Sequence, residues 1–170
     1  MILNMKYCAE CGTKLILKEC VNYGISEGMI PFCPKCNDFR FPIFNTAVST
    51  VIFNKDYSKT LLIKQYGKDW NILVGGYVNK TENLEKALIR EVKEEIGTDI
   101  SIVRFNCSEY FERSNTLLCN FITFSENEDL SMISAEVDYA QWYDIETAKD
   151  VILHASLAEK FFLEAIKKII

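Results

Sequence analysis

Apolar residues recur along this chain with two spacings, one typical of strands and the other typical of helices. Apolar or alternating runs bounded by turn-forming residues predict strands at 44–53, 60–65, 100–110, 117–124 and 136–144. Residues 84–96 and about 156–170 instead repeat their apolar positions with the period of an amphipathic helix. Strands interrupted by one helix and closed by another predict an α/β sandwich around a mixed sheet.

The predicted helix at 84–96 has a recognisable signal at each end. Asn83 is a suitable N-cap, and Gly97 stands where a helix normally stops. At about 100° per residue, one face of this helix is expected to be buried. That face carries Leu84, Ala87, Leu88, Val92 and Ile96.

Glu91, Glu94 and Glu95 are spaced along this helix so that their side chains are expected to converge on one patch. Like charges at this spacing repel, and carboxylates near a helix C-terminus oppose the helix dipole. A divalent cation would reverse both effects, because Mg²⁺ and Mn²⁺ prefer oxygen ligands. The alternative is a solvated charged face, such as Lys86 and Lys93 form on the other side.

Residues 1–42 are predicted to form a small domain of their own, followed by a second domain at 43–170, with Pro42 at the boundary. The chain has seven cysteines, an odd number that cannot be paired completely within one chain. Four of them form two CxxC pairs: Cys8, Cys11, Cys33 and Cys36. Two such turns predict a closed tetrahedral zinc site that stabilises a segment with little core. Redox dithiols and incidental cysteines are the alternatives.

The other cysteines and the single histidine are not expected to bind metal. Cys20 lies in the spacer 12–32, which is long enough for a short hairpin, and is interpreted as a small hydrophobic residue. Cys107 and Cys119 lie in predicted strands and are expected to be buried. His154 has no histidine partner and is expected to be a surface or packing residue.

Charge and hydropathy restrict the classes of partner. The formal net charge of −5 argues against a dedicated nucleic-acid binder, and residues 1–42 carry only one more basic than acidic residue. No apolar run reaches the roughly 20 residues that span a bilayer, so no membrane association is expected and a cytoplasmic location is the default. The helix at 156–170 is expected to pack on the core, with a dimer or membrane surface as the alternatives.

The segment from Gly76 to Gly97 resembles the Nudix box. The matching residues are Gly76, Glu82 and the run Arg90-Glu91-Val92-Lys93-Glu94-Glu95-Ile96-Gly97, whereas Thr98 replaces the usual aliphatic residue. The resemblance implies a Nudix α/β/α sandwich and Mg²⁺- or Mn²⁺-dependent hydrolysis of a nucleoside diphosphate linked to another moiety. It agrees with the sandwich that the hydrophobic pattern predicts.

A zinc ribbon directly before a Nudix domain is similar to the NADH pyrophosphatase family. This resemblance implies metal ligands at Glu91, Glu95, Glu136 and the backbone carbonyl of Gly75. It also places Tyr77 where that family stacks an aromatic ring on a base, although Tyr77 could equally be an ordinary strand tyrosine in a turn. Gly76 and Phe111 are the other predicted substrate contacts.

The mechanistic hypothesis gives the charged residues of the box separate roles. Glu91, Glu94 and Glu95 hold the catalytic cation, which neutralises the pyrophosphate and acidifies a bound water. Arg90 pairs with Glu94 or orients the neighbouring carboxylates, and Glu82 supports them from the loop. Glu94 is the first candidate for general base, with loop acids as alternatives: Glu109, Glu112 and Glu126.

Three departures separate the chain from the NADH pyrophosphatases. Segment 108–116 keeps only the first serine and one aromatic residue, Phe111, of the family's specificity signature, and it has no proline. The family's additional N-terminal domain is not expected, since the ribbon begins at the chain start. Asn79 stands where the family usually has an acidic residue, shortly after the glycine that opens the Nudix box. Fold and reaction type are therefore expected to transfer, whereas the preference for NADH is not.

Several functions remain open from the sequence. The leading one is hydrolysis of NADH, NAD⁺, ADP-ribose or a related diphosphate. A nucleoside triphosphate or nucleotide-sugar hydrolase is an alternative within enzymes, and a nucleotide-sensing protein that binds without turnover is an alternative from another class. The acidic balance makes NAD-capped RNA a less attractive substrate. The family resemblance also allows a homodimer.

Overall fold

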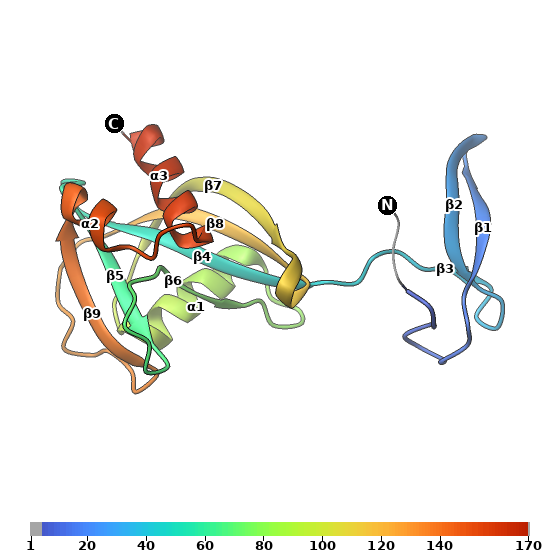
Figure 1. Cartoon of the computed structure of the whole chain (residues 1–170), viewed down its shortest axis with the longest axis horizontal. Coiled ribbons are helices and arrows are strands. Elements are labelled where there is room, and N and C mark those ends of the chain that lie inside the picture. Colours follow the sequence, from blue (N-terminus) through green and yellow to red (C-terminus); the bar gives the residue numbers. More distant parts are fainter. Residues whose placement is uncertain (1–4, 170) are drawn as a thin grey trace. The chain divides into compact units, whose positions relative to one another are not determined.

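The structure is a computed structural model that describes residues 5–169, except for the side chain of Val103 (Figure 1). Contacts between Cα atoms divide the chain into two compact units, with the division between Phe44 and Asn45. No helix among the described residues is both long and apolar enough to cross a membrane.

The first unit contains a three-stranded antiparallel sheet in the order β1-β2-β3. Its strands are β1 (Ile16–Asn22), β2 (Ile25–Cys33) and β3 (Asp38–Phe39). The hairpin between β1 and β2 turns at Tyr23 and Gly24, both of which have positive φ. A tight turn of this kind suits the right-handed twist of the two strands. The hairpin predicted in the spacer between the two CxxC pairs is therefore present, and Cys20 is buried within it.

The second unit is built on a mixed six-stranded sheet in the order β7-β8-β4-β5-β9, with β6 also paired to β4. Its strands are β4 (Asn45–Asn54), β5 (Lys59–Gln65), β6 (Val74–Tyr77), β7 (Ser101–Phe111), β8 (Thr116–Ser125) and β9 (Val137–Asp144). β4 runs parallel to β8 and antiparallel to β5 and β6. The five predicted strands are confirmed, each with ends within one or two residues of the expected ones.

Helices cover both faces of this sheet, as Figure 1 shows. The helix α1 (Leu84–Ile96) packs its buried face against one side, where Val92 and Ile96 join apolar residues of β4, β5 and β6. The helices α2 (Ile145–Val151) and α3 (Leu157–Ile169) lie on the other side, where Phe161 and Phe162 are fully buried. The α/β/α sandwich is confirmed, and helix α3 packs on the core as expected.

Two local features differ from the sequence analysis. Helix α2 was not predicted, because seven residues are too few to show a clear helical period. Cys107 is only half-buried, whereas Cys119 is buried as expected. The register of β7 against β8 shifts between Phe105 and Cys107, so this part of β7 does not follow regular alternation. A short 3-10 helix, η1 (Glu112–Ser114), follows β7.

Candidate functional site

Helix α1 is fixed at both ends by the residues that the sequence singles out. The Asn83 side chain accepts a hydrogen bond from the Lys86 amide at 2.9 Å. Gly97 adopts the left-handed conformation, with φ of 75°, and its amide donates to the Lys93 carbonyl. These caps set where the helix begins and ends, and so they set the direction of its glutamates relative to the sheet.

Gly75 and Gly76 bring the backbone of β6 unusually close to its neighbours. A Cβ atom at Gly76 would lie 2.2 to 2.4 Å from the Glu91 carboxylate group, and one at Gly75 would lie 2.4 Å from the Val48 carbonyl oxygen. Any side chain at either position would therefore force atoms to move. The two glycines let the Glu91 carboxylate lie directly against the backbone of β6.

The Glu95 side chain points into the unit and has an unpartnered oxygen. The residue is only 4% exposed, and its Oε1 accepts a hydrogen bond of 2.6 Å from Gln65 Nε2. Its Oε2 is buried and has no hydrogen-bond partner. Burial raises the pKa of the Glu95 carboxyl to about 7, the negative charges of Glu91 and Glu136 add to the rise, and the Gln65 amide and the Gly75 backbone oppose it.

Arg90 uses its whole guanidinium group to hold the acids of the box. Nε and Nη2 donate to the two oxygens of Glu82 at 2.9 Å each, and Nη2 also donates to the Tyr77 carbonyl at 3.0 Å. Nη1 donates to Glu91 at 2.7 Å and to Glu94 at 3.0 Å. The bond from Arg90 lowers the pKa of Glu82 to about 2. Arg90 thus pairs with Glu94 and orients two other carboxylates, so both predicted roles coexist.

Two of the three glutamates of the helix meet at one partner, since Glu91 and Glu94 both accept hydrogen bonds from Arg90 Nη1. The convergence of all three that the sequence analysis expected stays a prediction. The Glu94 side chain is 60% exposed and lies against Arg90, whereas Glu95 is turned toward Gln65. Among residues 5–169, only the four cysteines form a group of three or more Cys, His, Asp or Glu side chains whose ligand atoms all lie within 4.8 Å of one another. The carboxylates of the second unit would therefore have to draw closer together to share an ion. Glu95 is therefore buried, Glu91 lies against Gly76, and Glu94 is the most exposed of the three.

Two residues of this site were not predicted from the sequence. Gln65, the last residue of β5, donates a hydrogen bond to Glu95 Oε1. The next residue, Tyr66, has a positive φ of 58°. Burial raises the pKa of the Tyr66 hydroxyl, and the charges of Glu95, Glu136 and Glu91 add to the rise. The Tyr66 side chain itself is 73% exposed. No sequence signal marks either residue.

The predicted substrate contacts Tyr77 and Phe111 share the face of the sheet that α3 covers. Ser49 and Leu118 lie on this face, and the register pairs Tyr77 with Ala47 and Phe111 with Thr116. Both aromatic side chains are exposed, Tyr77 by 57% and Phe111 by 41%. A groove of about 770 Å³ adjoins Phe111, and its lining residues are Ile72, Phe111, Leu118, Ala155, Ser156, Leu157, Ala158 and Lys160. Gly76 instead faces Glu91.

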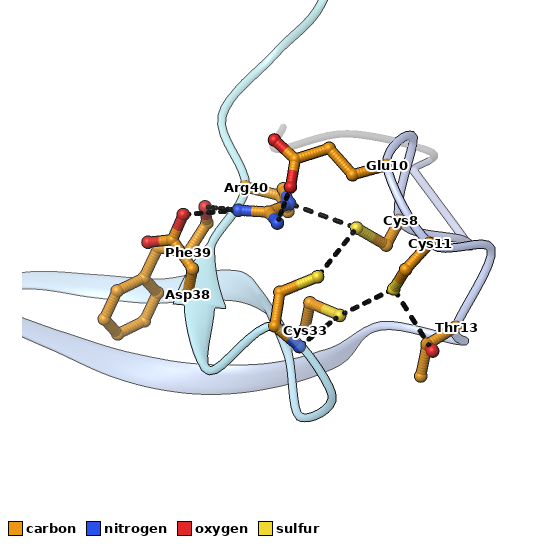
Figure 2. Close-up of polar contacts among 9 residues, drawn as sticks. Cys8, Glu10, Cys11, Thr13, Cys33, Asp38, Phe39 and Arg40 are labelled. Atoms are coloured by element: carbon orange, nitrogen blue, oxygen red, sulfur yellow. Dashed lines mark hydrogen bonds and ion pairs between the residues drawn. The ribbon is translucent and has the colours of Figure 1, made fainter.

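The first unit brings the four cysteines of the CxxC pairs together, as Figure 2 shows for three of them. Their sulfur atoms all lie within 4.8 Å of one another, with Cys11 and Cys33 at 3.5 Å and Cys8 and Cys36 at 4.0 Å. A tetrahedral zinc ion with Zn–S bonds of about 2.3 Å would place its sulfur ligands about 3.8 Å apart. The four sulfur atoms therefore fit such an ion.

Comparisons with known proteins relate the second unit to the NUDIX domain. Residues 44–163 match the NUDIX domain. The chain is 23% identical to the NAD-capped RNA hydrolase NudC of Vibrio atlanticus over 99% of its own length but only 60% of the length of that relative. It is 24% identical to Nudix hydrolase 19, chloroplastic, of Arabidopsis thaliana, covering 86% of the chain and 34% of the relative.

Solved structures support the same fold. A NUDIX hydrolase from Nitrosomonas europaea superimposes with a TM-score of 0.64 at 18% identity, covering 96% of this chain and 93% of that one. The NUDIX domain of Shewanella oneidensis NrtR, solved with ADP ribose, superimposes with a TM-score of 0.65 at 18% identity, covering 82% of this chain and 94% of that one. At these identities the likeness concerns the fold alone.

Proposed function

The chain belongs to the NUDIX family, and on that premise we propose that it is a divalent-cation-dependent pyrophosphohydrolase acting on a nucleoside diphosphate linked to another moiety. The observation that carries the proposal is the unpartnered, buried Oε2 of Glu95 beside Gly75 and Glu91. A buried carboxylate oxygen without a partner is costly unless a cation or hydrogen-bond donor completes it. A hard divalent cation matches that need, because the proposed ligands are carboxylate and carbonyl oxygens.

The residues proposed to hold Mg²⁺ or Mn²⁺ are Glu91, Glu95, Glu136 and the Gly75 carbonyl, with Glu94 joining them if its carboxylate turns from Arg90. When bound, the cation would neutralise the pyrophosphate and lower the pKa of water at the site. Gln65 would keep Oε1 of Glu95 occupied, which leaves Oε2 for the cation. Glu82 would hold Arg90 and thereby fix the position of Glu91.

Glu94 remains our first candidate for general base, with Glu109, Glu112 and Glu126 as alternatives. Its exposed carboxylate can accept a proton from water. The hydrogen bond from Arg90 holds this carboxylate at the solvent-exposed end of the Arg90 cluster. Of the alternatives, Glu109 is paired with Lys160 and Glu126 with Lys55. A Glu94→Gln protein with wild-type turnover would remove Glu94 from this role.

The rings of Tyr77 and Phe111 are the proposed contacts of the nucleoside, and Phe111 also lines the groove under α3. Tyr77 and Phe111 stand on the same face of the sheet and offer exposed aromatic surface for a flat ring. The names of similar proteins favour a dinucleotide or ADP-ribose type of substrate, since one relative is called an NAD-capped RNA hydrolase and one structural neighbour was solved with ADP ribose. NADH, NAD⁺ and ADP-ribose are thus the first compounds to test.

The four clustered cysteines are proposed to hold a structural Zn²⁺. Their four sulfur atoms leave no open position for a substrate on a tetrahedral ion, which is the arrangement of structural sites. The domain limits 1–42 and 43–170, a cytoplasmic location and a homodimer remain predictions.

The test of the function is a hydrolysis panel on the whole chain with Mn²⁺. NADH, NAD⁺, ADP-ribose, a nucleotide sugar and a nucleoside triphosphate would be incubated separately, and the products separated by chromatography. Release of AMP from NADH or ADP-ribose supports the proposed substrate class. Hydrolysis of the triphosphate or the sugar nucleotide alone would move the protein to the alternative substrate class. Tight binding without any product would favour a nucleotide sensor.

A further inference from the structure

Arg40 is a buried arginine that contacts the cysteine cluster of the first unit (Figure 2). It is 8% exposed, and its Nε donates to Cys8 Sγ at 3.2 Å. Nη1 donates to Asp38 Oδ2 at 2.5 Å and to the Phe39 carbonyl at 3.0 Å, and Nη2 donates to Glu10 Oε2 at 2.9 Å. The guanidinium is thus shared between one sulfur, one carbonyl and two carboxylates.

A backbone hydrogen bond to β2 fixes the position of the Arg40 main chain, from which the side chain extends. Arg40 follows β3, and its amide donates to the Pro31 carbonyl of β2 at 2.7 Å. That bond holds the Arg40 backbone beside the strand that ends at Cys33. The side chain then reaches Cys8, which precedes Arg40 by 32 residues. A single residue therefore joins the two segments that carry the CxxC pairs.

The two carboxylates do not account for the burial of Arg40. Glu10 and Asp38 are 73% and 67% exposed, so both could be solvated without Arg40. Exposed ion pairs contribute little stability, and a buried cation needs acceptors that are buried with it. The sulfur of Cys8 is such an acceptor, because Cys8 is buried.

Four thiolates around one Zn²⁺ leave a net charge of −2 on the cluster. We infer that Arg40 is a positioning residue of the cysteine site, which holds Cys8 Sγ through an N–H···S hydrogen bond and offsets part of the negative charge of the zinc cluster. The inference rests on the zinc proposal and is independent of hydrolysis at the second unit. Its consequence is slower loss of zinc, since partners of metal ligands typically contribute 10–100-fold to metal affinity.

Lys35 provides a matched control for charge alone. It lies between Cys33 and Cys36, and its side chain is exposed. Removing Lys35 deletes one positive charge close to the same cluster without deleting an N–H···S bond. Lys18 is less suitable, because its ammonium lies over the Phe32 ring at 4.1 Å.

The experiment compares whole-chain wild type with Arg40→Met, Arg40→Lys and Lys35→Met. Zinc content is measured first, and zinc release to a chromophoric chelator is then followed with time. Each protein is also loaded with Co²⁺, whose sulfur-to-metal charge-transfer band reports the electron density on the thiolates and whose d–d bands report tetrahedral geometry.

We expect Arg40→Met to lose zinc about 10-fold faster or more, and its charge-transfer band to move to lower energy while the d–d bands persist. Arg40→Lys keeps the charge without the planar fork and is expected to fall between Arg40→Met and wild type. Lys35→Met is expected to behave as wild type.

Equal release from Arg40→Met and wild type, with an unmoved charge-transfer band, would overturn the inference, as would equal effects of Arg40→Met and Lys35→Met. If Arg40→Met gives no tetrahedral Co²⁺ spectrum, Arg40→Lys decides: a shifted band supports the hydrogen bond, and a wild-type band and release rate contradict it. A wild-type protein that binds neither zinc nor cobalt would refute the zinc proposal and this inference with it, while leaving the proposed hydrolysis intact.

Discussion

Arg40 in the first unit and Arg90 in the second each gather several acceptors, but the two surroundings differ. Arg40 has one buried sulfur and two exposed carboxylates, in a unit whose sheet buries few side chains. Arg90 holds three carboxylates on a helix and loop that pack against an extensive core. The comparison predicts that the first unit needs zinc to fold, whereas the second would fold without a metal and need one only for hydrolysis.

Loss of zinc binding should have the largest effect, because it should unfold the first unit and leave the second unit folded. Structural zinc contributes about 10–16 kcal/mol to small zinc domains at neutral pH, which exceeds what so small a core can supply. Cys33→Ser, which alters a fully buried cysteine, should therefore unfold the first unit and leave the second folded. Amide hydrogen exchange should show loss of protection in 16–39 and wild-type protection in α1. Parallel loss in both units would contradict independent stabilisation.

Substitution of Arg90 should have the next largest effect, on activity. Arg90→Met removes the donors to Glu82, Glu91 and Glu94, so three carboxylates are left to repel one another. We expect kcat/KM to fall about 100-fold. Arg104→Met serves as the control, because Arg104 is an exposed arginine of β7. A fall equal to that of the control would show that Arg90 does not organise the site.

Gln65 should contribute less, through cation affinity. Gln65→Leu removes the hydrogen bond to Glu95 Oε1 and frees this oxygen to turn, so we expect about 10-fold weaker Mn²⁺ binding. Gln141→Leu on the neighbouring strand β9 is a control for loss of an amide. Mn²⁺ binding is measured by electron paramagnetic resonance of the free ion. Unchanged binding would separate Gln65 from the metal site.

The aromatic contacts should give the smallest effect. Tyr77→Ala and Phe111→Ala each remove one exposed ring, and stacking of this kind is worth about 1 kcal/mol. We expect KM for the substrate identified in the panel to rise several-fold with kcat nearly unchanged. Tyr57→Ala, on the turn after β4, is the control for loss of a tyrosine. A lower kcat with an unchanged KM would contradict the proposed contact between these rings and the nucleoside.

The helix and the cysteine cluster were predictable because their signals are local. Asn83 and Gly97 set the ends of α1, and the two CxxC pairs carry their own geometry. The contact of Gln65 with Glu95 was not predictable, since it joins a strand end to a helix 30 residues later. Convergence of the three glutamates was expected from helical spacing alone and stays a prediction. Spacing did not show that Arg90 would hold Glu91 and Glu94 together while Gln65 bonds Glu95.

Other details depend on tertiary contacts in the same way. Thr98, which departs from the usual pattern of the box, is buried and its hydroxyl shares a hydrogen bond of 3.2 Å with that of Ser125. In the sequence Arg40 contributed only one positive charge to the balance of residues 1–42, and nothing indicated that its side chain would bond Cys8 from the end of β3. Spacing identifies ligand types, and the fold decides which side chains support them.

The central claim is that Glu95 is the buried ligand of a cation required for hydrolysis. The most direct measurement compares Mn²⁺-dependent AMP release from ADP-ribose or NADH by wild type, Glu95→Gln and Glu85→Gln, where Glu85 is an exposed glutamate in the first turn of the same helix. Because loss of a ligand should exceed loss of its partner, we predict a fall of at least about 100-fold for Glu95→Gln and wild-type rates for Glu85→Gln. Wild-type turnover by Glu95→Gln would contradict the account.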